Sequence, residues 1–314
     1  MSEFDLIRRH FTRATPNVLL GVGDDCALLR VSAGKVLAVS TDMLVSGTHF
    51  FADADAFCLG HKTLAVNLSD MAAMGATPRW ATLALSLPSA DDAWLEQFSA
   101  GFFALAKKFN VDLVGGDTTR GPLNLCVTIM GEVDAQQALR RDGAQLGDDI
   151  WVSGKLGDAA VALAHLQGKV KLSDADFSVC APALHQPQPR VELGRALRGI
   201  AHSVIDISDG LLADLAHILD ASKVGAQLEF AALPMSDVLR AHKEFSQRGV
   251  LSGGDDYELC FTAAARHHDE LLRISAELNL PLTRIGKIVA GKGCVVHDAL
   301  GATIKIESGG YDHF

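Results

Sequence analysis

Strand-like and helical patterns alternate along the whole chain. Apolar runs bounded by turn residues predict strands at residues 36–39, 82–87, 112–114, 123–130, 150–153, 203–207, 257–262 and 294–297. Apolar residues spaced three and four apart predict helices between them, at residues 58–74, 93–109, 158–166, 190–197, 211–221 and 267–278. A chain in which strands alternate with helices in this way is predicted to fold as an α/β protein.

Two of the predicted helices differ in what they bury. The helix at 93–109 has one apolar face, formed by Leu95, Phe98, Phe102, Leu105 and Phe109. The helix at 58–74 is apolar on most sides and is closed by Gly75, yet it carries Asn67, Ser69 and Asp70. Polar side chains inside a buried helix need hydrogen-bond partners, so these residues either satisfy the helix itself or belong to a site.

The length of 314 residues favours two domains. A polar stretch with turn residues, 134–149, separates the two halves, and we place the boundary there, with domains at 1–137 and 138–314. Residues 169–189 contain Pro182, Pro187 and Pro189 and show little periodicity, so they are predicted to form an irregular connection within the second half.

Aspartates recur beside Gly, Ser and Thr, next to apolar runs. They lie in Gly21-Val-Gly-Asp-Asp25, Ser40-Thr-Asp42, Asn67-Leu-Ser-Asp70, Gly115-Gly-Asp-Thr-Thr119, Asp206-Ile-Ser-Asp-Gly210 and Ser252-Gly-Gly-Asp-Asp256. Carboxylate oxygens suit Mg²⁺, and small residues allow backbone N–H groups to approach phosphate. If these segments converge, the pattern indicates a protein that handles a nucleotide with several metal ions.

Composition excludes several other classes of protein. The net charge is −10, from 28 Lys and Arg against 38 Asp and Glu, which disfavours a nucleic-acid partner. The six cysteines have no paired spacing, which argues against a zinc site or a disulfide scaffold. The N-terminus lacks the apolar core of a signal peptide, and the apolar stretch 80–90 is too short to span a membrane. We therefore expect a soluble cytoplasmic protein without a membrane partner.

Neither common nucleotide fingerprint is complete. Residues 286–293 have the glycine and lysine spacing of a P-loop, but Gly293 stands where Ser or Thr should bind Mg²⁺, and a strand follows instead of a helix. We predict a β-turn between strands there. Gly21-Val-Gly23 is half of a dinucleotide-binding motif and lacks the third glycine.

The motifs taken together closely resemble the thiamine-monophosphate kinase family, and they follow the family's order from one end of the chain to the other. They are Gly21-Val-Gly-Asp-Asp-Cys-Ala27, Ser40-Thr-Asp-Met-Leu-Val-Ser-Gly-Thr-His-Phe50, Ala65-Val-Asn-Leu-Ser-Asp-Met-Ala-Ala-Met-Gly-Ala76, Gly115-Gly-Asp-Thr-Thr119, Ile205-Asp-Ile-Ser-Asp-Gly-Leu211, Gly253-Gly-Asp-Asp-Tyr-Glu-Leu259 and Gly310-Tyr-Asp-His-Phe314. A wider superfamily, which resembles aminoimidazole ribonucleotide synthetase, shares the aspartates. The block at 40–50 and the C-terminal motif narrow the resemblance to the kinase family.

The resemblance implies a two-domain α/β subunit that forms a homodimer, in which the N-terminal sheets of two subunits close into a β-barrel. The N-terminal domain would bind ATP and Mg²⁺ and dimerise, and the C-terminal domain would complete the nucleotide and substrate site. The implied reaction is direct transfer of a phosphoryl group from the co-substrate ATP to thiamine monophosphate, giving thiamine diphosphate with the help of several Mg²⁺ ions.

The resemblance also assigns roles to individual residues. The residues assigned to metal binding are Asp25, Ser40, Thr41, Asp42, Asp70, Asp117, Asp206 and Asp209. Contacts with ATP fall to Gly116, Asp117, Arg141 and Ser208. Contacts with thiamine monophosphate fall to His49, Asp255 and Tyr311, the last as a ring-stacking residue. No side chain is assigned as a general acid or base, so catalysis is expected to rest on metal ions and electrostatics.

Structural alternatives stay open for some of these residues. Asp24 is favoured as a turn residue over a metal ligand. Asp209 could cap the following helix, which does not exclude a metal contact. His49 would be called structural without the family match.

Two other functions remain as alternatives. One is a different ATP-dependent synthetase of the same superfamily, although no cysteine nucleophile stands in a glycine-rich N-terminal loop. The other is a non-catalytic module that binds ATP or Mg²⁺, which the complete set of aspartates disfavours.

Overall fold

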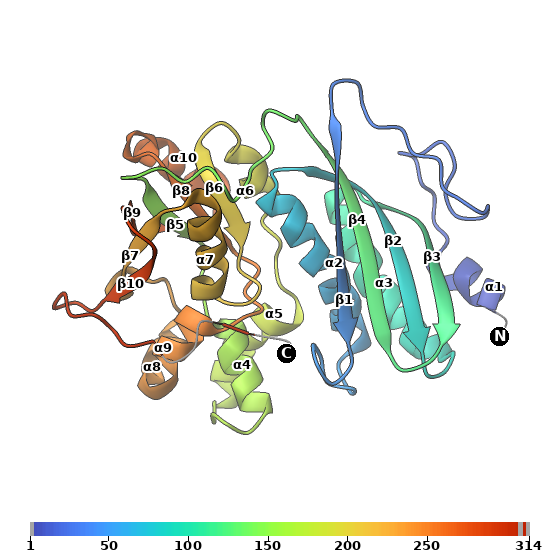
Figure 1. Ribbon diagram of the computed structural model, residues 1–314. Helices are drawn as coiled ribbons and strands as arrows, with labels where there is room; N and C mark the ends of the chain where they lie inside the picture. Colours follow the sequence, from blue (N-terminus) through green and yellow to red (C-terminus); the bar gives the residue numbers. More distant parts are fainter. Residues whose placement is uncertain (1–2, 307–309, 312–314) are drawn as a thin grey trace. The chain divides into compact units, whose positions relative to one another are not determined.

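The computed structural model describes residues 3–306 and 310–311 (Figure 1). The chain divides into two compact units, one comprising Met1–Met71 and Ala76–Gln136 and the other Ala72–Gly75 and Gln137–Phe314. Within the described residues each unit contains a β-sheet and helices. The predicted mixed α/β class is confirmed.

The first unit is built on a sheet with the strand order β1-β4-β2-β3. The strands are β1 (Val36–Val45), β2 (Thr77–Leu87), β3 (Asp112–Arg120) and β4 (Asn124–Val133). β4 pairs antiparallel with both β1 and β2, whereas β3 pairs parallel with β2. Helices α2 (Ala56–Ala73) and α3 (Asp92–Phe109) lie against one face of this sheet (Figure 1). A short helical segment, α1 (Glu3–Leu6) with η1 (Ile7–Phe11), precedes the sheet.

Helix α3 follows its sequence prediction closely because its ends carry strong local signals. The Asp91 side chain accepts hydrogen bonds from the backbone N–H groups of Ala93 and Trp94, and so caps the N-terminus. Asn110 ends the helix in the left-handed conformation, at φ 53°. All five residues of the predicted apolar face are buried, together with Ser99, Gly101 and Ala106.

Two glycines allow α2 and α3 to approach closely. A Cβ atom on Gly60 would lie 2.0 Å from the Phe98 carbonyl oxygen, and one on Gly101 would lie 1.9 Å from the Phe57 carbonyl oxygen. Both obstacles are backbone atoms, which cannot rotate away as a side chain can. The two helices therefore pack backbone against backbone at this crossing.

Gly101→Ala is expected to destabilise the first unit by about 3 kcal/mol, because the helices must separate to admit the methyl group. Native-state hydrogen exchange across α2 and α3 measures this loss. Ala100→Gly, at the exposed neighbouring position, is the control and should cost less than about 1 kcal/mol. Equal losses in the two variants would contradict the close packing.

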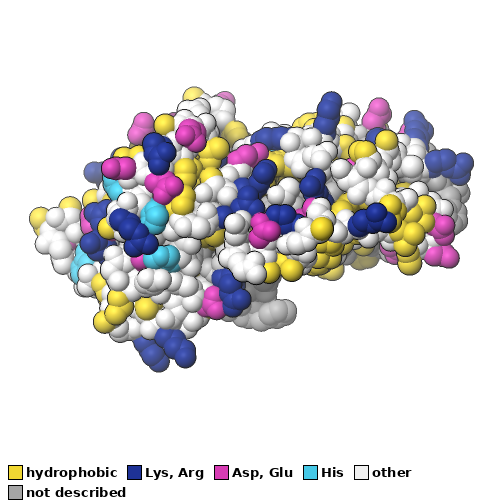
Figure 2. Space-filling model, turned by 90° about the horizontal axis from the view of Figure 1, so that it is seen from above, with side chains coloured by type: hydrophobic (Ala, Val, Ile, Leu, Met, Phe, Trp, Pro, Cys, Tyr) yellow, Lys and Arg dark blue, Asp and Glu magenta, His cyan; other side chains and the backbone are white. Residues whose placement is uncertain are grey.

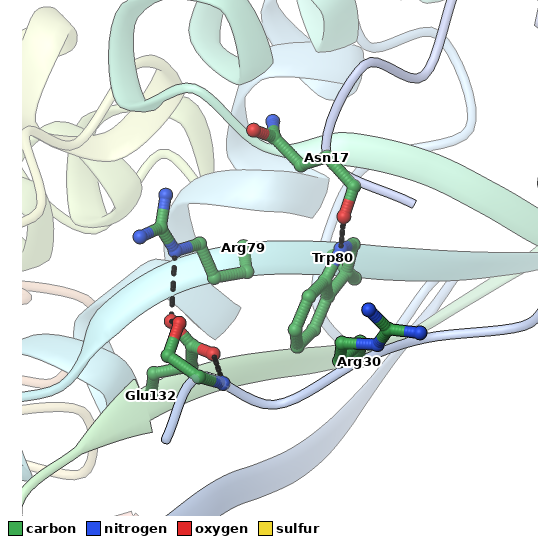
Figure 3. A pocket seen from close by; sticks show the side chains of 6 residues that line it. Asn17, Arg30, Arg79, Trp80 and Glu132 are labelled. Atoms are coloured by element: carbon green, nitrogen blue, oxygen red, sulfur yellow. Dashed lines mark hydrogen bonds and ion pairs between the residues drawn. The ribbon is translucent and has the colours of Figure 1, made fainter. Parts of the chain in front are cut away.

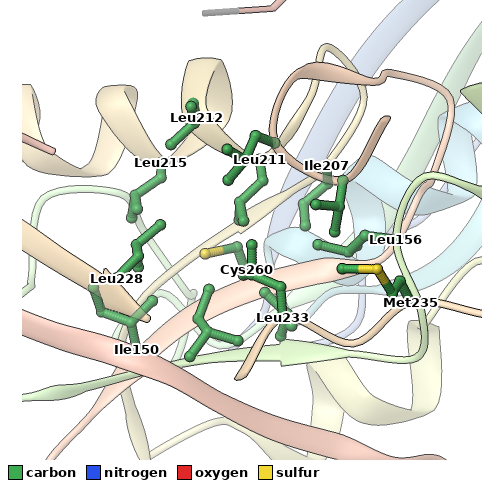
Figure 4. Packing of buried hydrophobic residues seen from close by; sticks show 14 of the residues in the cluster. Ile150, Leu156, Ile207, Leu211, Leu212, Leu215, Leu228, Leu233, Met235 and Cys260 are labelled. Atoms are coloured by element: carbon green, nitrogen blue, oxygen red, sulfur yellow. The ribbon is translucent and has the colours of Figure 1, made fainter. Parts of the chain in front are cut away.

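The second unit has a sheet with the strand order β10-β7-β9-β5-β8-β6. In chain order its strands are β5 (Asp149–Ser153), β6 (Ala201–Asp206), β7 (Gly225–Glu229), β8 (Leu259–Ala263), β9 (Leu282–Val289) and β10 (Gly293–His297). Its helices are α4 (Asp158–Leu166), α5 (Asp174–His185), α6 (Val191–Ala196), α7 (Leu211–Ser222), α8 (Asp237–Ala241), α9 (Lys243–Ser252) and α10 (His268–Glu277), with 3₁₀ turns η2 (Phe230–Ala232) and η3 (Ala265–His267). Leu211 and Leu215 of α7 pack with Ile150, Leu228 and Cys260 of the sheet in one core (Figure 4).

Several predicted boundaries are wrong. β1 extends to Val45 and β3 to Arg120, because each pairs along its whole length with a neighbouring strand. Ser40, Thr41, Asp42 and Asp117 therefore lie inside strands rather than beyond their ends. Strands β7 and β9 and helices α8 and α9 were not predicted, and the turn placed at 286–293 is limited to residues 290–292.

The connection predicted at 169–189 contains a helix instead. Ser173 caps α5 by accepting the Asp176 N–H at 3.1 Å. Pro182 lies within the helix. Cys180 and Leu184 are buried, and Phe177 packs against the same core. Burial of this spaced apolar face outweighs the hydrogen bond that proline removes.

The surface carries charges of both signs. On the face shown in Figure 2, acidic and basic side chains are interspersed. Among the described residues, no helix combines the length and the apolar character needed to cross a bilayer.

Candidate active site

In the first unit, three predicted metal ligands come from β1 and α2. Ser40 and Asp42 share the face of β1 that turns toward the helices, as the alternating burial of the strand indicates. The Ser40 hydroxyl donates to Asp70 Oδ2 at 2.5 Å, which links β1 to α2. The Asp42 N–H donates to Asn67 Oδ1 at 3.2 Å. These contacts bring Ser40, Asp42 and Asp70 into one group.

Asn67 belongs to this group and fulfils both alternatives that its place in a buried helix left open. Its Nδ2 donates to the Thr63 carbonyl one turn earlier, at 3.1 Å, and its Oδ1 accepts from β1. The side chain is 1% exposed. Asn67 thus satisfies its own helix and also fixes the strand that carries Asp42.

Thr41 lies on the opposite face of β1. Its hydroxyl is 2.9 Å from the hydroxyl of Thr128 on β4. Because side chains alternate along a strand, the Thr41 hydroxyl points away from Ser40 and Asp42. Within this unit the side chain of Thr41 therefore does not join those of Ser40 and Asp42.

Gly116 and Asp117 lie on β3, at the other edge of the sheet from β1. Three strand spacings separate the two edges, about 14 Å. Gly116 has φ 152°, and a Cβ atom there would lie 1.9 Å from the Leu83 carbonyl oxygen. This position admits glycine alone. Asp117 is exposed, and its neighbour across the strands is Ala84 of β2. This sheet therefore does not place Asp117 beside Asp42 of β1.

Asp24, Asp25 and His49 lie in loops of the first unit. Asp24 Oδ1 accepts the Asp25 N–H at 2.8 Å, a contact that suits the turn role of Asp24. Asp25 is exposed. His49 Nδ1 accepts the Val45 N–H at 3.0 Å, so its neutral ring carries the proton on Nε2. His49 therefore has a structural contact at Nδ1 and a donor at Nε2.

A pocket elsewhere in this unit contains none of the predicted site residues. It is lined by Asn17, Arg30, Ser32, Arg79, Trp80 and Glu132 (Figure 3). Glu132 accepts from Arg79 Nε at 3.2 Å and from the Ser32 N–H at 2.6 Å. Burial alone would raise the pKa of Glu132, but the bonds from Ser32 and Arg79 outweigh burial and lower it below the ordinary value. These contacts tie the loop at Ser32 to the sheet.

In the second unit, three segments distant in sequence converge around the loop that joins β6 to α7. The Asp255 N–H donates to the Ser208 carbonyl at 2.8 Å, and the Tyr311 N–H donates to the Asp209 carbonyl at 3.0 Å. Asp206 ends β6 directly before this loop. The structure thus brings together the predicted residues Asp206, Ser208, Asp209, Asp255 and Tyr311. The rest of the C-terminal motif, residues 312–314, lies outside the described residues.

The segment that carries Asp255 has an unusual backbone. Asp255 has φ 69° and Tyr257 has φ 50°, left-handed values that are uncommon for residues other than glycine. The Tyr257 hydroxyl donates to Asp255 Oδ1 at 3.0 Å. A Cβ atom on Gly254 would lie 2.5 Å from the Ser208 carbonyl oxygen. The Asp255 carboxylate is therefore oriented by Tyr257, on a backbone pressed against the Ser208 loop.

Sequence reasoning missed Asp214, a buried residue of α7. Its Oδ2 accepts the N–H groups of Ser208, Asp209 and Gly210, at 3.0, 3.0 and 3.1 Å. Burial and the nearby charge of Asp206 raise the pKa of Asp214 to about 7, although the backbone bonds oppose this. Gly210 occupies the N-cap position of α7, so the alternative that Asp209 caps the helix is wrong.

Two further carboxylates of the 253–259 motif are structural. Asp256 accepts the Gly157 N–H before α4, at 2.9 and 3.0 Å, and burial holds its pKa well above the ordinary value. Glu258 forms a bidentate ion pair with Arg190 and accepts from the Ser153 hydroxyl. The three acidic residues of one motif thus have three different partners.

Arg141 lies in the segment before β5. Its side chain is exposed, and its carbonyl accepts the Ser222 hydroxyl at 3.0 Å. Ser222 also accepts the Ala144 N–H at 3.1 Å. The end of α7 therefore holds the backbone of Arg141 while its guanidinium group faces solvent.

The predicted ligands have the chemistry that Mg²⁺ prefers, since all carry carboxylate or hydroxyl oxygens. Across residues 3–306 and 310–311, no group of three or more His, Cys, Asp or Glu side chains stands ready to hold a metal. Mg²⁺ in phosphoryl-transfer enzymes typically uses one or two carboxylates and completes its shell with water and substrate phosphates. The residues present fit that mode of binding.

Comparison with known proteins identifies the family. Residues 23–133 match the model of the AIR synthase related protein, N-terminal domain, and residues 145–299 match that of the C-terminal domain. The chain is 48% identical to thiamine-monophosphate kinase of Escherichia coli (strain K12), over 99% of this chain and 98% of that protein.

Solved structures agree with these matches. The crystal structure of thiamine-monophosphate kinase from Stenotrophomonas maltophilia K279a has a TM-score of 0.86 and 52% sequence identity, and the match covers 96% of each chain. AaThiL complexed with AMPPCP and TMP has a TM-score of 0.79 and 28% identity, covering 99% of this chain and 96% of that one. The chain therefore belongs to the thiamine-monophosphate kinase family, as the ordered motifs of its sequence predicted.

Proposed function

We propose that this protein uses ATP to phosphorylate thiamine monophosphate to thiamine diphosphate. The observation that carries the proposal is the 48% identity with a thiamine-monophosphate kinase over essentially the whole of both chains. A structural neighbour, AaThiL, is complexed with AMPPCP and TMP, which supports binding of both substrates by this fold. We also propose a cytoplasmic location, where ATP is supplied.

The nucleophile in this reaction is a phosphate oxygen of the substrate. A phosphate monoester has a second pKa of about 6, so near neutral pH this oxygen is largely ionised. It attacks the γ-phosphorus of ATP, forming one P–O bond while the P–O bond to ADP breaks. No proton has to be removed, so none of the side chains acts as a general base.

The main obstacle is repulsion between two anions, and bound Mg²⁺ would offset this charge and hold the phosphates in line. In the first unit, Asp42, Asp70 and Ser40 supply oxygen ligands on one face, and Asp25, Thr41 and Asp117 supply others. In the second unit, Asp206 and Asp209 supply carboxylates beside Ser208. We propose that both units take part, the first mainly through metal and ATP and the second through nucleotide and substrate contacts.

On the substrate side we propose His49, Asp255 and Tyr311. The Asp255 carboxylate, oriented by Tyr257, would face the positive charge of the thiazolium ring, and Tyr311 would stack on a thiamine ring. We propose His49 as a contact to the substrate phosphate, held in its loop by the hydrogen bond that its Nδ1 accepts from the Val45 N–H. For ATP we propose Gly116, Asp117, Ser208 and the exposed cation Arg141.

We also propose a homodimer in which the sheets of two first units close into a β-barrel. The outer face and edge of β1 support this arrangement, because Val36, Leu37, Val39 and Met43 are 44, 41, 57 and 55% exposed. A second copy would cover these residues and pair the open edge. Sedimentation should give twice the chain mass, and Val39→Lys should shift it to the monomer. A monomeric wild type would refute the dimer.

The function is tested by incubating the protein with ATP, Mg²⁺ and thiamine monophosphate and identifying the product by mass. We expect thiamine diphosphate and ADP in equal amounts. ATP consumption that depends on an amide or selenide substrate, with none on thiamine monophosphate, would instead indicate another synthetase of the superfamily. ATP binding without any turnover would indicate a non-catalytic module.

Tyr257→Phe is expected to raise the KM for thiamine monophosphate about fivefold, since one hydrogen bond to Asp255 is worth about 1 kcal/mol. The KM for ATP should stay within about twofold, because Tyr257 orients only the Asp255 carboxylate, which is proposed to contact thiamine monophosphate and not ATP. Tyr311→Phe keeps an aromatic ring and serves as the control. An unchanged KM for thiamine monophosphate in Tyr257→Phe would contradict the proposed orientation.

A further inference from the structure

Each backbone N–H and C=O group of the loop between β6 and α7, residues 207–210, has a partner within the chain. The Ile207 N–H donates to the Glu258 carbonyl and the Ile207 carbonyl accepts from Tyr257, both at 2.8 Å. The carbonyls of Ser208, Asp209 and Gly210 accept from Asp255, Tyr311 and Asp214, respectively, at 2.8, 3.0 and 3.0 Å. The three remaining N–H groups all donate to Asp214 Oδ2. Every backbone donor and acceptor of the loop is therefore paired.

Asp214 occupies a position at the N-terminus of α7 where many proteins bind phosphate. Free N–H groups at a helix N-terminus, aided by the helix dipole, are a frequent binding site for phosphate. At α7 these groups point at a carboxylate of the chain itself, and Asp214 is 3% exposed. An ATP phosphate cannot bind these N–H groups without displacing a buried side chain.

The loop is also fixed from the core side. Ile207, the first residue of the loop, and Leu211, the residue that follows it, are fully buried among the core residues of Figure 4. Gly210 has φ 116°, and a Cβ atom there would lie 2.8 Å from the Ser252 carbonyl carbon. With its backbone bonded and its ends buried, the loop presents outward the side chains of Ser208 and Asp209.

We infer that Asp214 is a positioning residue, which locks this loop so that Ser208 and Asp209 meet nucleotide and metal through their side chains alone. This inference rests on the proposed function, because it takes ATP with Mg²⁺ as the ligand. The carboxylate also occupies the N–H groups at the helix N-terminus and so keeps phosphate from binding them. Asp214 acts through the loop and touches neither substrate.

The test compares Asp214→Ala and Asp214→Asn with Asp220→Ala, which removes an exposed carboxylate from the same helix. Asn retains an oxygen that can accept the three N–H groups, whereas Ala retains none. Hydrogen exchange of the Ser208–Gly210 amides reports the loop directly. Calorimetry with ATP and Mg²⁺ reports ligand affinity without turnover, and kinetics give KM and kcat for each substrate.

We expect exchange of the loop amides to quicken at least about tenfold in Asp214→Ala and ATP affinity to fall about tenfold or more, with Asp214→Asn between it and wild type. Asp220→Ala should match wild type in both. Unchanged loop exchange together with wild-type ATP affinity in Asp214→Ala would overturn the inference. Equal loss of ATP affinity in both Asp214 variants, with loop exchange unchanged in Asp214→Asn, would also overturn it by showing that charge matters rather than position.

Failure of the proposed function gives a different result. A wild-type protein that makes no thiamine diphosphate, yet binds ATP more tightly than Asp214→Ala does, refutes the kinase reaction and supports the positioning role. A wild type that binds no ATP refutes both.

Discussion

Asp42→Asn is expected to lower kcat by about 10²–10³-fold while the protein stays folded. Asn has nearly the same shape as Asp, and the backbone N–H of residue 42 can still donate to Asn67. What the substitution removes is the negative charge on the face shared with Ser40 and Asp70. If that face holds metal and phosphate during transfer, removing the charge destabilises the transition state and lowers kcat.

Steady-state kinetics at saturating Mg²⁺ measure the effect, with thermal unfolding to confirm that the fold is intact. Asp53→Asn, in an exposed turn of the same unit, is the matched control and should retain wild-type kcat. Asp117→Asn is expected to show a loss similar to that of Asp42→Asn, because it removes the charge of another proposed metal ligand. Asp117 is exposed on β3, so the fold should stay intact in this variant. Wild-type kcat in Asp42→Asn would remove residue 42 from the proposed metal ligands.

The sequence predicts elements well where local signals agree. Helix α3 has its apolar spacing, its Asp91 cap and its Asn110 terminus all within the helix or beside it, so its bounds follow from the sequence. The end of strand β1 is predicted too early, because Ser40, Thr41 and Asp42 have the composition of a loop. Pairing with β4 along ten residues keeps them in the strand. That pairing is a long-range interaction, which a local pattern cannot reveal.

The candidate site likewise has a part that local motifs predict and a part that depends on long-range strand pairing. The motifs identify Asp206, Ser208, Asp209 and Asp255, and the structure brings them together in the second unit. They do not show that β1 and β3 are opposite edges of one sheet, which separates Asp42 from Asp117. The closed barrel of two sheets that we propose for the dimer would give both edges a neighbouring strand.

Supporting residues were missed because their partners lie far away or are backbone groups. Asp214 is four residues from Gly210, and an acidic residue in the first turn of a helix was a usable signal. Glu258 offered no such signal. Its partners Arg190 and Ser153 are 68 and 105 residues distant in sequence.

Arg190→Ala is expected to destabilise the second unit by about 3–5 kcal/mol, because it leaves a buried carboxylate without its cation. Glu258 is 6% exposed and pairs with both Nε and Nη2 of Arg190. The Ser153 hydroxyl, 2.5 Å from Glu258 Oε2, cannot replace a positive charge. Arg195→Ala, at an exposed position of α6, is the control and should cost less than about 1 kcal/mol.

A double variant separates loss of the charge pair from loss of packing. Arg190→Met with Glu258→Gln removes both charges and keeps most of the volume, so it should recover much of the stability lost in Arg190→Ala. Denaturant unfolding and hydrogen exchange across β8 measure each variant. Glu258 follows Tyr257 directly, so release of its side chain should also loosen Asp255 and raise the KM for thiamine monophosphate in Arg190→Ala. If Arg190→Ala unfolds no more readily than Arg195→Ala, the ion pair does not stabilise this segment, and the orientation of Asp255 must depend on Tyr257 and the Ser208 loop alone.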